Sequence, residues 1–326
     1  MRKLIAAPSI AFLLASLIVI AMVAACGGDD TSNPSSSAST TPTKSVTRTP
    51  TPIPTPTEVP TIAPATPTFR TVTPKPEPTP VDDLGDEKLL LSLGDSLAAG
   101  RGASDASRKS WVALTIQGLG DGYELLNLGV PGHDSDDLIN KQLDRAVSEI
   151  QARNNDGTPG NETVAITLEI GGNDLLALYE DLVLTGLCPS VVEGLQIQEC
   201  VDRLRGALDH YRPNLEHILD ALQAADPSVP IFLMTLYNPF SGGSVNLDGI
   251  GTLALEGQEG TPFPEGINDI IRQVGQAKGA IIVDWYPIFI GKVNEYIAPD
   301  LVHPNDTGHA LMAQAVLEAM AQHGLP

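Results

Sequence analysis

Short apolar runs alternate with amphipathic stretches from residue 87 to the end of the chain. Five apolar runs predict buried strands, at residues 89–93, 123–128, 163–170, 231–236 and 280–284. Apolar residues at helical spacing predict helices near residues 135–153, 201–225, 267–278 and 306–322. Nearly continuous apolar strands that alternate with helices are typical of a parallel sheet covered on both faces. The pattern therefore predicts an α/β fold, a three-layer α/β/α sandwich around a five-stranded parallel sheet.

Residues 241–261 interrupt this alternation. The segment is rich in glycine and acidic residues and has neither a helical nor a strand period. Such a long irregular segment is either a lid that faces the substrate or a disordered insertion. Because it follows the fourth predicted strand, close to the expected site, the lid is the favoured interpretation. Residues 182–200 are expected to form the opposite wall of the pocket.

The first 25 residues have the pattern of an export signal. Arg2 and Lys3 precede an apolar run from Ile10 to Ala25. A run of about sixteen residues is shorter than the roughly twenty that span a bilayer. The small residues before Cys26 resemble the lipobox of bacterial lipoproteins, which implies cleavage before Cys26 and lipid on its thiol. The alternative is an ordinary signal peptide in which Cys26 is incidental.

Residues 26–83 are dominated by threonine, proline and serine. They contain too few apolar side chains to form a core, so we expect an extended, disordered stalk. The remaining residues, 84–326, form one predicted domain. If Cys26 is lipidated, the stalk holds this domain outside the cytoplasm, on the outer face of the cell membrane.

The chain carries 40 acidic and 19 basic residues, for a formal net charge of -21. This charge repels phosphate backbones, so a nucleic-acid partner is not expected. The expected contact with a membrane is through the lipid anchor, and we expect the protein to be a monomer. An exported protein is in a compartment that permits disulfides. Cys188 and Cys200 flank a short polar segment and are predicted to pair, with two free thiols as the alternative.

Candidate catalytic residues stand at one predicted strand end and near the carboxyl terminus. Ser96 follows the first strand in a Gly-Asp-Ser turn that can present its hydroxyl in a crevice. His303 is a candidate base for that hydroxyl, and Asp300, three residues earlier, can hold the other ring nitrogen. Each feature alone also fits an ordinary turn or a surface histidine.

Two further turns offer hydrogen-bond donors. Gly129 follows the second strand, where its backbone N–H can approach a ligand closely. Asn173 follows the third strand, and its side-chain amide can donate as well. Donors aimed at developing negative charge are the usual requirement of acyl transfer. Read singly, both segments are plain turns.

Together these segments resemble the SGNH (GDSL-type) hydrolase family, named for Ser, Gly, Asn and His in that order. The resemblance covers residue 89 to the end and implies a sheet of flavodoxin-like order. It assigns Ser96, His303 and Asp300 to a catalytic triad, and the oxyanion hole to Ser96, Gly129 and Asn173.

The implied activity is that of a serine esterase or lipase that forms an acyl-enzyme, without a metal or other cofactor. The substrate is an ester, either a small molecule or a polysaccharide. The alternative within this chemistry is an O-acetylesterase acting on xylan or peptidoglycan. The alternative of another class is a tethered binding module without catalysis, which has no need of a full triad.

Overall fold

A parallel sheet of five strands lies at the centre of the computed structural model, which describes residues 86–326. Its order is β2-β1-β3-β4-β5, and all neighbouring strands are parallel, as in flavodoxin-like sheets. The strands are β1 (Lys88–Gly94), β2 (Tyr123–Asn127), β3 (Thr163–Glu169), β4 (Ile231–Met234) and β5 (Ile281–Val283). The predicted strands and the α/β/α class are confirmed.

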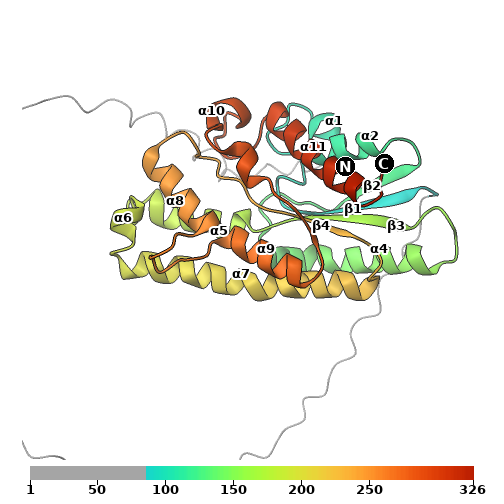
Figure 1. Ribbon diagram of the computed structural model, residues 1–326, viewed down its shortest axis with the longest axis horizontal. Coiled ribbons are helices and arrows are strands. Elements are labelled where there is room, and N and C mark those ends of the chain that lie inside the picture. The colour runs from blue at the N-terminus through green and yellow to red at the C-terminus, as the bar shows by residue number, and fades with distance from the viewer. Residues whose placement is uncertain (1–85) are drawn as a thin grey trace, which may run out of the picture. The chain divides into compact units, whose positions relative to one another are not determined.

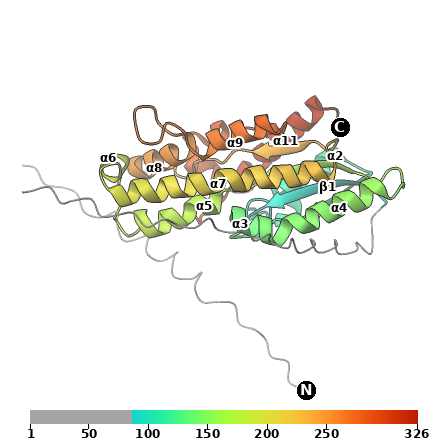
Figure 2. The same cartoon turned by 90° about the horizontal axis from the view of Figure 1, so that it is seen from below.

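Helices cover both faces of this sheet (Figure 1). One face packs against α4 (Asp144–Asn155), α7 (Gln198–Ala225) and α9 (Ile267–Ala277), which Figure 2 shows from their own side. The other face packs against α2 (Trp111–Leu119) and α11 (Asp306–Gln322). The short helices are α1 (Ala106–Lys109), α3 (Ser135–Leu138), η4 (Ile139–Leu143), η6 (Tyr286–Phe289) and α10 (Val293–Tyr296).

Strand β1 explains why the strands are apolar at almost every position. Leu89, Leu91 and Leu93 belong to the core on the side of α7. Leu90, which points the other way, belongs to the core beneath α11. Because side chains alternate between two buried faces, a strand in the middle of the sheet has no solvent side that would favour polar residues.

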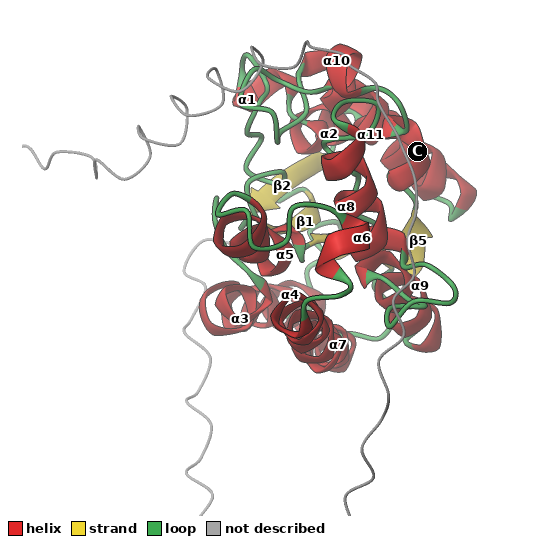
Figure 3. Ribbon diagram, turned by 90° about the vertical axis from the view of Figure 1, so that its left-hand side faces the viewer, coloured by secondary structure: helices red, strands yellow, loops and turns green. Residues whose placement is uncertain are grey.

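Four helical segments gather beyond the carboxyl ends of the strands. Figure 3 looks onto this end of the molecule. The segments are α5 (Gly172–Leu178), η5 (Tyr179–Val183), α6 (Val191–Gly194) and α8 (Val245–Glu256). Helices α6 and α8 contact each other, and α8 also packs against α9.

Helix α8 corrects the prediction of an irregular segment at residues 241–261. Gly249 and Gly251 lie inside the helix, and glycine is a poor helix former, so they obscured its pattern. The apolar positions Leu247, Ile250 and Ala254 are nevertheless spaced three and four residues apart, as on one face of a helix. The side chains of this face line a cavity described below.

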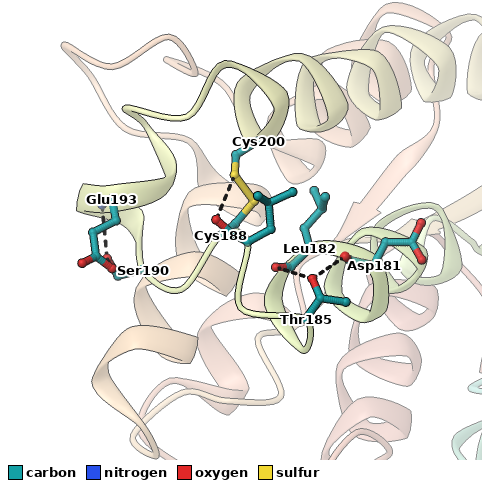
Figure 4. The surroundings of a disulfide bond; sticks show 8 residues. Asp181, Leu182, Thr185, Cys188, Ser190, Glu193 and Cys200 are labelled. Carbon is teal, nitrogen blue, oxygen red and sulfur yellow. Dashed lines mark hydrogen bonds between the residues drawn. A yellow bond between two sulfur atoms is a disulfide. The ribbon is translucent and has the colours of Figure 1, made fainter.

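A disulfide joins Cys188 to Cys200, which lies in the first turn of α7 (Figure 4). Both cysteines are buried and pack against Leu182. The Thr185 hydroxyl, in the turn after η5, donates to the backbone carbonyl of Asp181 at 2.7 Å. The bridge therefore fastens the segment between η5 and α6 to the long helix α7.

The predicted signal segment, Cys26 and the stalk to residue 83 lie outside the described residues. Among residues 86–326, none of the helices combines the length and the apolar character needed to cross a bilayer.

Replacing both cysteines by serine is expected to lower the free energy of unfolding by about 2–3 kcal/mol, since the bridge restricts the unfolded chain over a short loop. Urea denaturation of the oxidised protein and of the Cys188→Ser/Cys200→Ser variant measures this difference. Wild-type protein kept in reductant is the matched control and should behave like the variant. Equal stability of all three samples would show that the bridge does not constrain the unfolded chain.

Candidate active site

The loops that follow three neighbouring strands meet at one edge of the sheet. Strand β1 pairs with β2 on one side and with β3 on the other. Ser96 comes two residues after β1, Gly129 two residues after β2, and Asn173 lies in the first turn of α5, after β3. The carboxyl ends of parallel strands are where α/β proteins gather their functional groups. The topology thus brings these residues close to one another.

Ser96, His303 and Asp300 form a hydrogen-bonded chain. The Ser96 Oγ atom lies 2.9 Å from His303 Nε2, and His303 Nδ1 lies 2.7 Å from Asp300 Oδ2. A carboxylate only accepts, so the ring carries its proton on Nδ1 and Nε2 is free to accept from the serine hydroxyl. This is the arrangement in which an imidazole removes a proton from a nucleophile.

Asp300 is held as a carboxylate. Partial burial acts to raise its pKa, but hydrogen bonds from the His303 ring and from the backbone N–H groups of His303 and Val302 outweigh burial and lower the pKa to about 2. Asp300 therefore stays ionised at any pH at which the imidazole works, and its charge stabilises an imidazolium at His303.

The loop that carries His303 is fastened on several sides. The His303 carbonyl accepts from Ala298 N–H at 2.8 Å, and the Val302 carbonyl accepts from the Tyr237 hydroxyl at 2.8 Å. Leu301 turns the loop with a positive φ of 66°, a conformation that non-glycine residues rarely adopt. Asn305 then caps α11 by accepting from the N–H groups of its first turn. These contacts fix the position of the His303 imidazole relative to the Ser96 hydroxyl.

The turn at Ser96 is tight because of Gly94. Gly94 is opposite Glu169 in the sheet, and a Cβ atom at position 94 would lie only 2.4 Å from the Glu169 carbonyl oxygen. Only glycine permits this approach. The next residue, Asp95, is buried and accepts from Leu97 N–H at 2.9 Å, which holds the backbone around the serine.

Gly129 packs directly against this turn. A Cβ atom at Gly129 would lie 2.6 Å from the Cβ of Ala98. Asn127 ties the two loops together, since its amide donates to the Ala98 carbonyl at 2.7 Å and its side-chain oxygen accepts from Gly129 N–H at 2.9 Å. The Gly129 N–H therefore faces the Asn127 side chain here, and its predicted oxyanion role stays a prediction.

The Asn173 amide donates in two directions. Its Nδ2 atom lies 2.8 Å from the His133 carbonyl and 3.1 Å from Asp95 Oδ2. Neighbouring Asp174 accepts from Ser135, from the hydroxyl at 2.5 Å and from the backbone N–H at 3.0 Å. The Asn173 amide is thereby oriented toward Asp95, the residue before Ser96, and its oxyanion role stays a prediction.

Two histidines that resemble polar surface residues in the sequence are instead buried. His309 has no exposed surface; its ring bonds to the Trp111 N–H and the Arg101 carbonyl, and burial lowers its pKa. His133 contacts Gln142, whose amide also pairs with the backbone of Gly94. Sequence spacing carried no signal for these contacts, because their partners come from distant segments.

A cavity of about 190 Å³ opens beside Ser96 and His303. Its walls come from α5, η5, α6, the start of α7 and α8, so residues 182–200 and α8 both contribute to it. The lining is almost entirely apolar, and it includes Leu176, Tyr179, Val191, Leu204, Phe240, Ile250 and Phe263. Within the described part of the chain, no three His, Cys, Asp or Glu side chains gather as a metal site would require.

Residues 92–311 match the GDSL-like lipase/acylhydrolase family. The chain is similar to an uncharacterised protein, YpmR, of Bacillus subtilis, with 25% identity over 246 residues, 73% of this chain and 83% of that protein. It is also similar to the spore germination lipase LipC of Bacillus licheniformis, with 27% identity over 110 residues, 34% of this chain and 45% of that protein. Its fold is similar to that of the lipase Lip_vut3 from a goat rumen metagenome, with a TM-score of 0.51 and 21% identity over 71% of this chain and 97% of that one.

The substitution Asp300→Asn is expected to lower kcat on a chromogenic ester by on the order of 10³–10⁴-fold, because an amide permits the wrong tautomer of His303. Initial rates of ester hydrolysis at saturating substrate measure this change in kcat. Asp121→Asn, at an exposed position away from the site, is the matched control and should retain full activity. A kcat within a few-fold of wild type for Asp300→Asn would remove Asp300 from the triad.

Proposed function

As the chain belongs to the GDSL-like lipase/acylhydrolase family, we propose that this serine ester hydrolase is a lipase-type enzyme that cleaves esters of extended acyl chains. The observation that carries the proposal is the apolar cavity beside Ser96 and His303. The similarity to a relative named a lipase supports the same substrate class.

Hydrolysis proceeds in two acyl-transfer steps. His303 takes the Ser96 proton as Oγ attacks the ester carbonyl, while Asp300 stabilises the imidazolium. The N–H groups of Ser96 and Gly129 and the Asn173 amide hold the oxyanion. For this the Gly129 N–H leaves Asn127 Oδ1 and one Asn173 N–H leaves Asp95 Oδ2, their acceptors in the resting site. His303 then protonates the leaving alcohol, and an acyl-enzyme remains on Ser96. Water, activated by the same imidazole, releases the acid and restores the serine.

The size and lining of the cavity favour an extended acyl chain over an acetyl group. An apolar cavity of about 150 Å³ is already large enough to bind benzene, and this one has about 190 Å³. An acetyl methyl would leave most of the apolar wall without a partner, whereas each buried methylene contributes about 0.8 kcal/mol. A lipase or long-chain esterase therefore fits this cavity better than a polysaccharide O-acetylesterase.

The amino-terminal sequence supports a place outside the cytoplasm. A lipid on Cys26 would anchor the protein, and the Thr/Pro-rich stalk to residue 83 would hold the hydrolase domain away from the bilayer. The Cys188–Cys200 disulfide fits an oxidising compartment. We propose an enzyme tethered to the outer face of the membrane that acts on esters within reach of its stalk.

The value of kcat/KM is expected to rise from p-nitrophenyl acetate to the octanoate, by up to about fourfold for each methylene that the cavity buries. Steady-state kinetics across the ester series measures this slope. Ser96→Ala should abolish turnover of every ester. A steep preference for acetate would contradict the proposal and favour acetylated polysaccharides.

Two substitutions in α8 test whether the cavity causes the preference for longer acyl chains. Ile250 lines it, so Ile250→Trp should fill the space and flatten the chain-length slope while sparing acetate hydrolysis. Val245 lies on the same helix, is 87% exposed and is not part of the lining. Val245→Trp is therefore the matched control, and an equal effect of both substitutions would place the acyl chain elsewhere.

A further inference from the structure

Glu169 is an ionisable residue at the centre of the sheet. It ends β3, which is flanked by β1 and β4, and its side chain has no exposed surface. Glu169 is paired with Gly94 in the sheet, and a Cβ atom at Gly94 would lie 3.1 Å from Glu169 Oε2. The carboxyl therefore lies beside the next residue, Asp95, whose own carboxyl it faces. None of the N–H or O–H groups that the structure describes around it donates to either oxygen in good hydrogen-bond geometry. An ionised carboxylate in this position would carry a large cost, since burial of an unpaired charge is strongly unfavourable.

Asp95, the other member of this carboxyl pair, has the donors that Glu169 lacks. It is 2% exposed, and Leu97 N–H donates to Oδ1 at 2.9 Å. The Asn173 amide donates to Oδ2 at 3.1 Å. Hydrogen bonds to a carboxylate favour its charged form. Of the two carboxyls, Asp95 is therefore equipped to be the anion.

We propose that Glu169 keeps its proton at neutral pH and donates a hydrogen bond to the Asp95 carboxylate, which makes Glu169 a positioning residue for the Asn173 amide and the Ser96 turn. The positioning role of Glu169 rests on the oxyanion role proposed for Asn173. The protonation state of Glu169 and Asp95 is independent of that role.

The electrostatics of the surroundings agree with this assignment. Burial raises the pKa of Glu169 well above its ordinary value, and the negative charge of Asp95 raises it further. Burial also raises the pKa of Asp95, but only to about 6, because its hydrogen bonds, first among them the one from Leu97 N–H, oppose the effect. The other titratable groups facing the pair are Tyr211 and Tyr237, and burial keeps both neutral by raising the pKa of each.

Sharing one proton has a consequence for catalysis. If both carboxyls were ionised, their repulsion would move Asp95 away from Asn173. The Asn173 amide would then lose the contact that orients it. With the proton on Glu169, Asp95 stays in place and part of its charge is drawn toward Glu169. The proton therefore limits the negative charge on the side of Asn173, where an oxyanion would form.

Infrared spectroscopy of the full-length protein tests the protonation state without any substrate. The C=O stretch of a buried, protonated carboxylic acid should be present at neutral pH in the wild type and absent from Glu169→Gln. Its absence from the wild type would overturn the proposal. Because this readout needs no turnover, it stays valid even if the protein fails to cleave long-chain esters.

Stability as a function of pH gives a second, independent readout. Unfolded Glu169 loses its proton above its ordinary pKa of 4.5, whereas the folded state keeps it. Wild-type protein therefore releases a proton on unfolding, and its unfolding equilibrium constant should rise relative to that of Glu169→Gln by about tenfold per pH unit above this value. If the ratio of the wild-type unfolding constant to that of Glu169→Gln did not change between pH 5 and pH 8, Glu169 would be ionised in the folded protein.

Kinetics tests the positioning role. Glu169→Leu removes the donor and should lower kcat by on the order of 10–100-fold with little change in KM, since the loss falls on the oxyanion. Glu169→Gln restores a donor and should recover most of that loss. If Gln were as damaging as Leu while the infrared band is present, the proton would exist but would not position Asn173.

Discussion

The parallel pairing of β1 with β2 on one side and β3 on the other is the constraint on which the rest of the structure depends. It brings the loops that carry Ser96, Gly129 and Asn173 to one edge of the sheet, although they are far apart in the chain. Glycine at 94 and 129 then lets these loops approach to distances that any side chain would prevent. Ser96, Gly129 and Asn173 lie together because three backbones run in the same direction and end together.

The remaining parts of the site are added around this edge. The loop before α11 supplies His303 and Asp300, and its contacts with Tyr237 and Ala298 set the imidazole 2.9 Å from the serine oxygen. The helices beyond the strand ends contribute no group to the triad. They build an apolar cavity next to it, braced by a disulfide on one wall. In the proposed function, chemistry and acyl-chain selection are carried by different layers of the fold.

Much of this architecture is predictable from sequence, because a strand buried on both faces is apolar along its whole length and helix α9 has a clear apolar stripe. The family resemblance added the order of the sheet and the identity of the triad. Sequence alone did not reveal helix α8, whose two glycines obscure its apolar face, or the burial of His133 and His309. The contact between Asp95 and Glu169 was also missed, since it depends on strand register and no local pattern encodes it.

A crystal structure of the protein inhibited by a p-nitrophenyl octylphosphonate would test the proposed mechanism. This mechanism predicts phosphorus bonded to Ser96 Oγ and a phosphonyl oxygen within hydrogen-bond distance of the N–H groups of Ser96 and Gly129 and of the Asn173 amide. It also predicts the octyl chain inside the apolar cavity, against α8. An adduct on another residue, or an octyl chain directed into solvent with the cavity left empty, would contradict it.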